Sequence, residues 1–350
     1  MNKYLITLIF SVITLATIAY AQVIPAPIPV FEPQIALGCL IMSYSGYCQE
    51  NVLQAFPCPN CAKTPAWNSF FGGKVPSNIV QGEGLEWYSF EFGLAFYFAT
   101  IRDNTAAVLT FRGTDNRWNI AEDLLFMQRS YPWVAGARVH RGIYNAWDDI
   151  RFLVMTKLRR FMNEKCLTCS TIYVTGHSLG GGLATFAAID VAKAYQPQGI
   201  NVIAYSFGSP RVGNMAFVQH FQKIVPNNFR VVNGLDNIPH MPLPRLDLDV
   251  FGETDYIHVT NEVWLHSNVT GPESAFVYNT TLECQGNENP SCSASAQIPW
   301  TDFDSSYLFW RYHRSYFGFY LPSYCHGWFQ TPILESGSNT NTVSTNTTTL

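Results

Sequence analysis

The sequence predicts an α/β domain in which helices cover both faces of a mainly parallel sheet. Short apolar or β-branched runs alternate with longer stretches of helical spacing through the middle of the chain. The chain has 350 residues, of which 47% are hydrophobic, so it is long enough to bury a large core. There is no linker-like change of composition and no internal repeat between the two ends. We therefore expect one domain spanning residues 32–330.

The expected elements follow one another in a regular order. A pair of strands is expected within Leu85–Phe111, because residues 85–92 alternate in polarity and residues 106–111 form an apolar run. Arg151–Glu164 has the spacing of an amphipathic helix. The remaining elements, in chain order, are a strand at 171–175, a helix at 183–193, a strand at 201–207, a helix at 216–223 and a strand at 229–233.

Residues 1–21 have the features of a secretory signal peptide. Lys3 precedes the uncharged stretch Tyr4–Tyr20, and Ala19-Tyr20-Ala21 fits a cleavage site. The stretch is slightly short for a membrane anchor, and no later segment approaches the length of a membrane helix. We therefore expect an extracellular protein, or one in the lumen of a secretory or digestive compartment, without a transmembrane segment.

The two flanks of the domain have distinctive compositions. A Pro-rich lead occupies residues 22–31 and is expected to be extended. Residues 331–350 form a Ser/Thr/Asn-rich tail with few apolar side chains, which we expect to be disordered. Because the chain is expected to be exported, its Asn-x-Thr sequences predict N-glycosylation at Asn268, Asn279 and Asn346.

Charge and composition exclude several classes of function. The formal net charge is −4 and only 13% of residues are charged, so there is no basic field for nucleic acid. The low charge and the 15% aromatic content favour an apolar substrate. There is no His-x-x-x-His motif and no acidic cluster, so we expect neither a metal nor a cofactor.

The most informative motif is Gly176-His177-Ser178-Leu179-Gly180. It lies where a β-branched strand meets a helix of small residues, which is the context of a nucleophile elbow. A sharp turn there exposes the hydroxyl of Ser178 at a helix N-terminus, where the helix dipole favours developing negative charge. The alternative is an ordinary glycine-rich turn with a solvated serine. We favour Ser178 as a nucleophile.

A serine nucleophile needs a general base and a carboxylate that orients it. Asp236 follows the apolar run 229–235, at the end of a strand where sites collect in α/β sheets. The competing acids lie in a Pro-containing loop and are expected to be solvated: Asp247, Asp249 and Asp255. His313 lies in an aromatic segment that can shield a base. Spacing does not exclude the other later histidines, His240, His258, His266 and His326.

The sequence resembles the class 3 lipases, the filamentous-fungal triacylglycerol lipase family, from about Ala36 to Cys325. Besides the elbow, the segments that carry the resemblance are Thr110–Thr114, Val139–Trp147, Phe207–Asn214, Asn233–Pro242 and His313–Gly318. The resemblance implies an α/β-hydrolase fold with a short helical lid. It also places the family's catalytic aspartate on Asp236 and its catalytic histidine on His313, the two residues favoured above.

The resemblance further implies acyl transfer through an acyl-enzyme. Ser178 would attack an ester, His313 would carry the proton, and the oxyanion would bind the N–H groups of Thr114 and Leu179, assisted by the Thr114 hydroxyl. We expect His140 and His177 to be structural. Arg112 and Arg211 are expected to brace loops.

The nine cysteines are expected to form disulfides, because the export signal makes a zinc site less favoured. The family pattern pairs Cys48 with Cys325, Cys58 with Cys61, and Cys284 with Cys292. Cys166 and Cys169 are additional and could pair locally, which leaves Cys39 as the odd cysteine.

The lid implied by the resemblance falls on Asp115–Met127. The apolar residues Ile120, Ala121, Leu124 and Leu125 have helical spacing, and charged residues lie largely opposite. The segment is either a helix packed permanently on the core or a lid that opens at a lipid surface; the family favours a lid. A tryptophan that the family has near Ile120 stands at Trp118 instead.

These observations lead to a secreted serine hydrolase that acts on carboxylic esters of lipids. Triacylglycerol lipase leads, while phospholipase A1 and feruloyl-type esterase share the same motifs and stay open. A catalytically inactive secreted binding protein is the alternative from another class, and the complete Ser/Asp/His set argues against it. A cysteine- or metal-based enzyme fits the cysteine spacing less well. We expect a monomer that contacts a lipid interface transiently.

Overall fold

The computed structural model describes residues 29–56, 61–83, 95–114, 127–247, 253–266, 280–296, 310–321 and 325. The part described here belongs to a compact unit that begins at Phe31. Several predictions lie outside the described residues: the signal peptide, the C-terminal tail, the lid residues Trp118, Ile120, Leu124 and Leu125, the three glycosylation sites, Cys58, Asp249 and His326.

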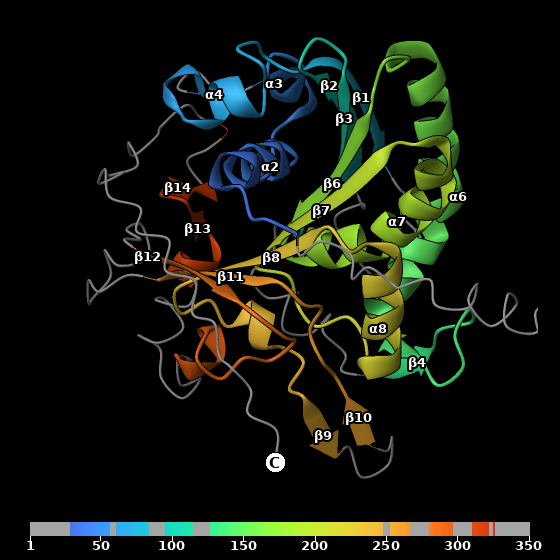
Figure 1. Cartoon of the computed structure of the whole chain (residues 1–350), viewed down its shortest axis with the longest axis vertical. Coiled ribbons are helices and arrows are strands. Elements are labelled where there is room, and N and C mark those ends of the chain that lie inside the picture. Colours follow the sequence, from blue (N-terminus) through green and yellow to red (C-terminus); the bar gives the residue numbers. More distant parts are fainter. Residues whose placement is uncertain are drawn as a thin grey trace, which may run out of the picture. The chain divides into compact units, whose positions relative to one another are not determined.

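An eight-stranded sheet forms the centre of this unit, in the order β1-β2-β3-β6-β7-β8-β11-β12 (Figure 1). The five strands from β3 to β11 pair in parallel, and β1, β2 and β12 pair antiparallel at the edges. This confirms the predicted mainly parallel sheet. The strands are β1 (Ser77–Glu83), β2 (Ala95–Ile101), β3 (Ala106–Phe111), β6 (Thr171–His177), β7 (Asn201–Phe207), β8 (Asn228–Asn233), β11 (Glu262–His266) and β12 (Thr280–Cys284).

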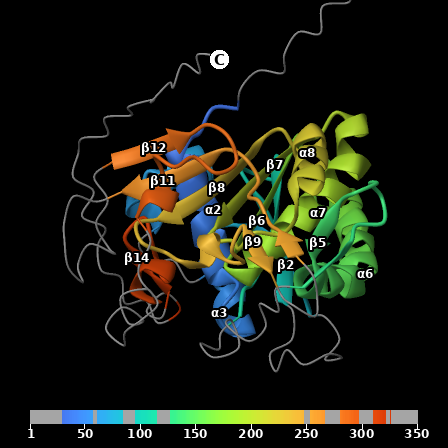
Figure 2. The ribbon, with the colours of Figure 1, turned by 90° about the horizontal axis from the view of Figure 1, so that it is seen from below.

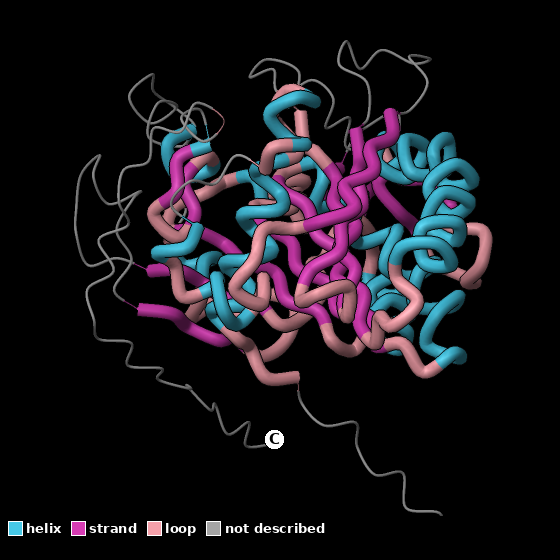
Figure 3. Tube along the Cα trace, turned by 90° about the horizontal axis from the view of Figure 1, so that it is seen from above, coloured by secondary structure: helices cyan, strands magenta, loops and turns pink. Residues whose placement is uncertain are grey.

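Helices cover both faces of the sheet (Figures 1 and 3). One face carries α6 (Arg141–Lys165), α7 (Leu179–Tyr195) and α8 (Met215–Ile224); the other carries α2 (Pro33–Ser45), α3 (Glu50–Gln54) and α4 (Ala66–Ser69). Successive strand residues alternate between the two cores, as the pleat requires. In β3, Leu109 packs towards α6 and α7, whereas Val108 packs in the core that contains α2.

Smaller elements surround the sheet, and Figure 2 shows several of them from below. Three antiparallel pairs are formed by β4 (Gln128–Ser130) with β5 (Arg138–His140), β9 (Arg245–Asp247) with β10 (Glu253–Asp255), and β13 (Ser315–Tyr316) with β14 (Phe319–Tyr320). The short 3₁₀ helices are η1 (Cys61–Lys63), η2 (Gln196–Gln198), η3 (Ile238–His240) and η5 (Ser293–Ser295).

Most of the predicted elements are confirmed, and the differences have local causes. The strands expected at 106–111 and 201–207 match β3 and β7. Helix α6 begins at Arg141 rather than Arg151, because the Nδ1 atom of His140 caps it by accepting the Ile143 N–H at 3.3 Å. The strand expected at 85–92 lies outside the described residues. The antiparallel partner of β3 is β2 instead.

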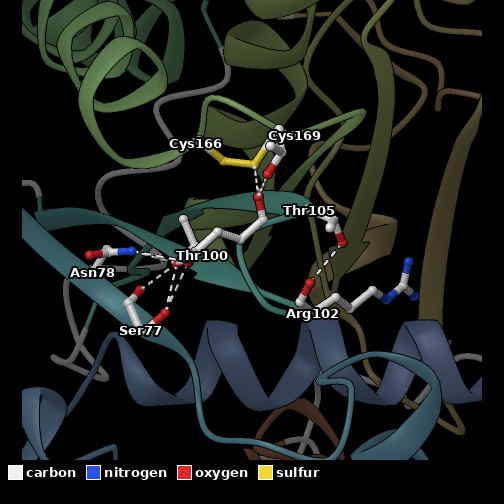
Figure 4. Close-up of a disulfide and its surroundings, with 9 residues drawn as sticks. Ser77, Asn78, Thr100, Arg102, Thr105, Cys166 and Cys169 are labelled. Atoms are coloured by element: carbon white, nitrogen blue, oxygen red, sulfur yellow. Dashed lines mark hydrogen bonds between the residues drawn. A yellow bond between two sulfur atoms is a disulfide. The ribbon is translucent and has the colours of Figure 1, made fainter.

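Three disulfides join described cysteines. Cys48–Cys325 connects the two ends of the domain across 277 residues, Cys284–Cys292 closes a short loop, and Cys166–Cys169 closes the turn between α6 and β6. Figure 4 shows the last of these above the turn that follows β2. Cys61 is also disulfide-bonded, and Cys39 is a buried free thiol. Among the described helices, none is long and apolar enough to cross a bilayer.

Candidate active site

Ser178 lies in the sharp turn between β6 and α7. Its backbone has φ +59° and ψ −129°, a conformation that a side-chain-bearing residue rarely adopts. The turn also brings α7 against the end of β3, where a Cβ built on Gly180 would lie 2.3 Å from the Phe111 carbonyl oxygen. Glycine is therefore required at position 180, and the strand, turn and helix predicted around Ser178 are present.

Ser178, His313 and Asp236 lie in hydrogen-bonding contact. The Nε2 atom of His313 is 2.9 Å from the Oγ atom of Ser178. On the other side of the ring, Nδ1 lies 3.0 Å from Oδ2 and 3.1 Å from Oδ1 of Asp236. A carboxylate only accepts, so Nδ1 carries a hydrogen and Nε2 of the neutral ring can accept the serine hydroxyl proton.

Asp236 is fully buried, and donors surround its carboxylate. Oδ1 accepts the Ile238 N–H at 2.9 Å, and Oδ2 accepts the hydroxyl of Tyr316 at 2.6 Å. Burial alone would raise the pKa of Asp236, but His313, Tyr316 and the Ile238 N–H together lower it below its ordinary value. Asp236 is therefore held as an anion beside the His313 ring.

The strand end before Asp236 also fixes the segment that carries His313. Asn233 is the last residue of β8, and its side-chain amide donates to the carbonyls of Tyr312 at 3.3 Å and Ser315 at 2.5 Å. Gly208, with φ +58°, lies against Asp236 and His313. A Cβ built on Gly208 would lie 2.8 Å from Oδ2 of Asp236 and 3.0 Å from Nδ1 of His313. The backbone after β7 thus leaves no room for a side chain at this position.

A second histidine lies against His313. The ring of His177 is 4.7 Å from that of His313, and its Nε2 donates to the His313 carbonyl at 2.7 Å. Because Nε2 carries the hydrogen, Nδ1 accepts the hydroxyl of Tyr47 at 2.9 Å. Burial, followed by the nearby His313, lowers the pKa of His177 to about 3. His177 therefore stays neutral near neutral pH.

Tyr47 connects this histidine to the end of β3. Its hydroxyl oxygen accepts the N–H of Gly113 at 3.1 Å. A Cβ built on Gly113 would lie 3.0 Å from the Cβ of Ser178, so the backbone of Gly113 lies close to the serine. Thr114 is the next residue in the chain. Leu179 begins α7 on the other side of Ser178, and N–H groups in the first turn of a helix lack intrahelical acceptors.

Four of the other residues considered from the sequence make contacts outside this group. The side chain of His266 packs against Trp264, and that of His258 donates from Nε2 to the Pro239 carbonyl. Asp255 is exposed and pairs with Arg138, as expected for a solvated acid. Arg211 braces loops, as predicted: its Nη1 donates to the carbonyls of His240 and Pro242 at 2.5 and 2.8 Å.

Sequence reasoning missed Tyr47, Gly208 and Tyr316. Tyr316 is three residues after His313 and Gly208 directly follows β7, so both stood in quoted motifs without an assigned role. Tyr47 lies 66 residues before Gly113 and carried no local signal. Within the described ranges, no three His, Cys, Asp or Glu side chains are grouped as metal ligands.

Comparisons with known proteins agree with this geometry. Residues 108–246 match the sequence profile described as "Lipase (class 3)". The chain is 33% identical over 214 residues to "Lipase" of Rhizomucor miehei, covering 60% of this chain and 51% of that protein. It is 32% identical over 202 residues to "Secreted mono- and diacylglycerol lipase 1" of Fusarium solani, covering 57% of this chain and 56% of that protein. The match thus spans about half the length of these relatives.

A solved structure shows the same fold over a larger share of the chain. It is described as a triacylglycerol lipase whose catalytic centre is formed by a serine protease triad. The TM-score is 0.58 at 24% identity, and the alignment covers 84% of this chain and 98% of that chain. This likeness establishes the α/β-hydrolase fold.

Proposed function

We propose that this chain is a secreted serine hydrolase of acylglycerol esters and a member of the class 3 lipase family, whose profile matches residues 108–246. The observation that carries the proposal is the contact of Ser178 Oγ with His313 Nε2 at 2.9 Å, in a turn where Ser178 has φ +59°. The relatives named as lipases support lipid esters as the substrate class.

In the proposed reaction, Ser178 Oγ attacks the ester carbonyl while His313 Nε2 takes the hydroxyl proton. The oxyanion binds the N–H groups of Thr114 and Leu179, with the helix dipole of α7 contributing at Leu179. The intermediate collapses when His313 returns the proton to the leaving alcohol. Water then attacks the acyl-Ser178 ester by the same proton transfers, which releases a fatty acid and restores the hydroxyl.

Asp236 keeps His313 productive in each of these steps. Its buried carboxylate holds the Nδ1–H tautomer and stabilises the imidazolium that forms when His313 takes the serine proton. His177 adds no competing charge, because its pKa is lowered to about 3. The ring that lies 4.7 Å from that of His313 therefore remains neutral near neutral pH.

The substrate class is tested with a panel of triolein, tributyrin, phosphatidylcholine and methyl ferulate. We expect hydrolysis of the two triacylglycerols to exceed that of the other two esters. Ser178→Ala should lower every rate by at least about 10⁴-fold while leaving the melting temperature unchanged. Dominant turnover of phosphatidylcholine or methyl ferulate would contradict the acylglycerol proposal, and retained turnover in Ser178→Ala would contradict the nucleophile.

Access to Ser178 requires a movement, because its side chain is 1% exposed and that of His313 is 2% exposed. This supports the lid predicted at Asp115–Met127, most of which lies outside the described residues. With a lid, the rate on tributyrin should rise sharply once droplets form. A smooth saturation curve through the solubility limit would favour a permanently packed helix.

Export is part of the proposal. The charged flank, the apolar stretch and the cleavage motif in residues 1–21 support export. Relatives named as secreted lipases support it as well. N-terminal sequencing of protein collected from the medium should begin at Gln22. Retention of the intact N-terminus on membranes would contradict cleavage.

A further inference from the structure

A polar network of Glu288, Arg211 and His258 holds the backbone that follows Asp236. Its centre is Glu288, in the loop closed by the Cys284–Cys292 disulfide. Glu288 accepts two hydrogen bonds from Arg211, from Nε at 2.7 Å and from Nη2 at 2.9 Å. It also accepts the N–H of His258 at 2.9 Å. Glu288 therefore fixes two donors at once, and one of them is an arginine whose side chain is only 2% exposed.

These two donors hold the backbone that follows Asp236. Arg211 donates from Nη1 to the carbonyls of His240 and Pro242 and from its own N–H, at 2.8 Å, to the Met241 carbonyl. His258 donates from Nε2 to the Pro239 carbonyl. Four successive carbonyls, from residue 239 to residue 242, thus accept from Arg211 or His258, the two residues that Glu288 contacts.

The same backbone segment begins at the carboxylate of Asp236. The N–H of Ile238, the first residue of η3, donates to Oδ1 of Asp236 at 2.9 Å. A rotation of η3 would therefore move one of the hydrogen-bond donors that hold the carboxylate facing His313. A shift of about 1 Å at a catalytic group can lower the rate up to about 100-fold. The four hydrogen bonds to the 239–242 carbonyls would therefore matter for the rate if they keep η3 from moving.

The disulfide loop is anchored on its own side as well. Glu262 forms a buried ion pair with Arg230 at 2.7 Å, and its other carboxylate oxygen accepts the N–H of Ser293, next to Cys292, at 3.0 Å. Glu262 also pairs with Cys284 across β11 and β12. The position of Glu288 is therefore fixed relative to the sheet by a covalent bond and a buried carboxylate.

We propose that Glu288 is a positioning residue for Asp236: it acts through Arg211 and His258 on the 239–242 backbone, and the Cys284–Cys292 disulfide holds it in place. This inference rests on the proposed function, in which Asp236 orients His313. It assigns a role in the reaction to the loop closed by Cys284–Cys292, which acts through the 239–242 backbone.

The test is the substitution Glu288→Gln in the full chain, assayed on p-nitrophenyl butyrate at a temperature far below unfolding. We expect kcat to fall about 10-fold with KM within about twofold, because glutamine replaces one acceptor oxygen by an NH2 group, which breaks one of the two hydrogen bonds from Arg211 and misaligns the carboxylate of Asp236. The matched control is Glu164→Gln, which removes an exposed partner of Arg160 on α6 and should leave kcat unchanged.

A double-mutant cycle separates positioning from general destabilisation. In an Asp236→Asn background, where activity is already about 10⁴-fold lower, adding Glu288→Gln should have no further effect beyond about twofold. An equal 10-fold loss in both backgrounds, or an unchanged kcat in Glu288→Gln, would overturn the inference. If Asp236→Asn alone kept full activity, the proposed function would fail instead.

A second variant covers the case in which Glu288→Gln does not fold. Cys284→Ser combined with Cys292→Ser opens the loop but keeps the Glu288 charge. We expect the same kind of loss, about 3-fold in kcat and absent in the Asp236→Asn background. An open loop with normal kcat would show that the disulfide does not contribute to positioning.

Discussion

The two halves of the candidate site are built by different means. Ser178 is positioned by main-chain geometry: β6, the turn and α7 are consecutive in the sequence, and Gly180 lets α7 reach the end of β3. Asp236 and His313 are 77 residues apart and are positioned by side chains that reach across the fold. The nucleophile half is therefore set by local sequence, and the acid–base half depends on long-range hydrogen bonds.

This difference determines what substitutions should do. In the nucleophile half, a change acts on the turn itself or on the donors beside it. In the acid–base half, we expect removal of the Tyr316 hydroxyl or the Glu288 carboxylate to leave the fold intact and to displace the charged carboxylate of Asp236. We therefore expect large effects from the reacting groups and graded effects from the residues that hold them.

The largest effect is expected for His313→Ala, which removes the base from the acid–base half. Without a proton acceptor at 2.9 Å, Ser178 is a weak nucleophile, and kcat/KM should fall by at least about 10⁴-fold. His266→Ala is the matched control, because that ring packs on Trp264. A severe loss in His266→Ala with activity retained in His313→Ala would show that the base is misassigned.

Thr114→Val tests the nucleophile half through the proposed oxyanion hydroxyl. Valine keeps the shape but cannot donate, so kcat should fall about 100-fold with little change in KM. Thr114→Ser keeps the hydroxyl and should retain most of the activity. Equal activity of the valine and serine variants would remove the hydroxyl from the mechanism and leave the oxyanion to the N–H groups.

Tyr316→Phe tests the hydrogen bond that holds the Asp236 carboxylate in the acid–base half. The hydroxyl donates to Asp236 at 2.6 Å, so its loss should raise the pKa of Asp236, loosen the carboxylate and lower kcat about 10-fold. Tyr97→Phe removes a similar buried hydrogen bond, 2.6 Å long, which is donated to the Met42 carbonyl and not to Asp236. If both variants lose stability but neither loses kcat, Tyr316 is only structural.

The smallest effect concerns stability in acid. Burial lowers the pKa of His140 to about 4 from 6.5, so below pH 6.5 the unfolded chain binds a proton that the folded chain does not bind until about pH 4. The free energy of unfolding should therefore fall as the pH drops from 6.5 to 4. Each such histidine contributes up to about 1.4 kcal/mol per pH unit.

His140→Asn isolates this contribution, because asparagine can still cap α6 but does not titrate. Urea unfolding between pH 4.5 and 7.5 should give a smaller pH slope for the variant than for the unchanged protein. Identical slopes would mean that His140 has the same pKa in the folded and the unfolded chain. His177, His240 and His258, whose pKa values are also lowered by burial, should then contribute to the remaining slope.

The comparison also explains how much could be predicted from the sequence. The elbow, the parallel strands and the partners Asp236 and His313 were accessible, because periodicity and strand ends are local signals and the family motifs mark the rest. Tyr47, Gly208 and Glu288 were not. Their roles depend on where distant loops meet, as when Glu288 reaches Arg211 across 77 residues.

The sequence also left element boundaries uncertain where caps decide them. Helix α6 was expected from Arg151, yet the His140 ring starts it at Arg141. Strands β11 and β12 were not predicted, although they carry the Glu262 and Cys284 that anchor the disulfide loop. Such side-chain-to-backbone contacts join segments that no short window of sequence contains.

The central claim is that Ser178 is a nucleophile activated by His313. Its most direct test is reaction with an alkyl fluorophosphonate, followed by tandem mass spectrometry of the modified peptide. We expect one adduct per chain, located on Ser178, and a labelling rate that collapses in His313→Ala. An adduct on another residue, or labelling of Ser178 at an unchanged rate without His313, would contradict the claim.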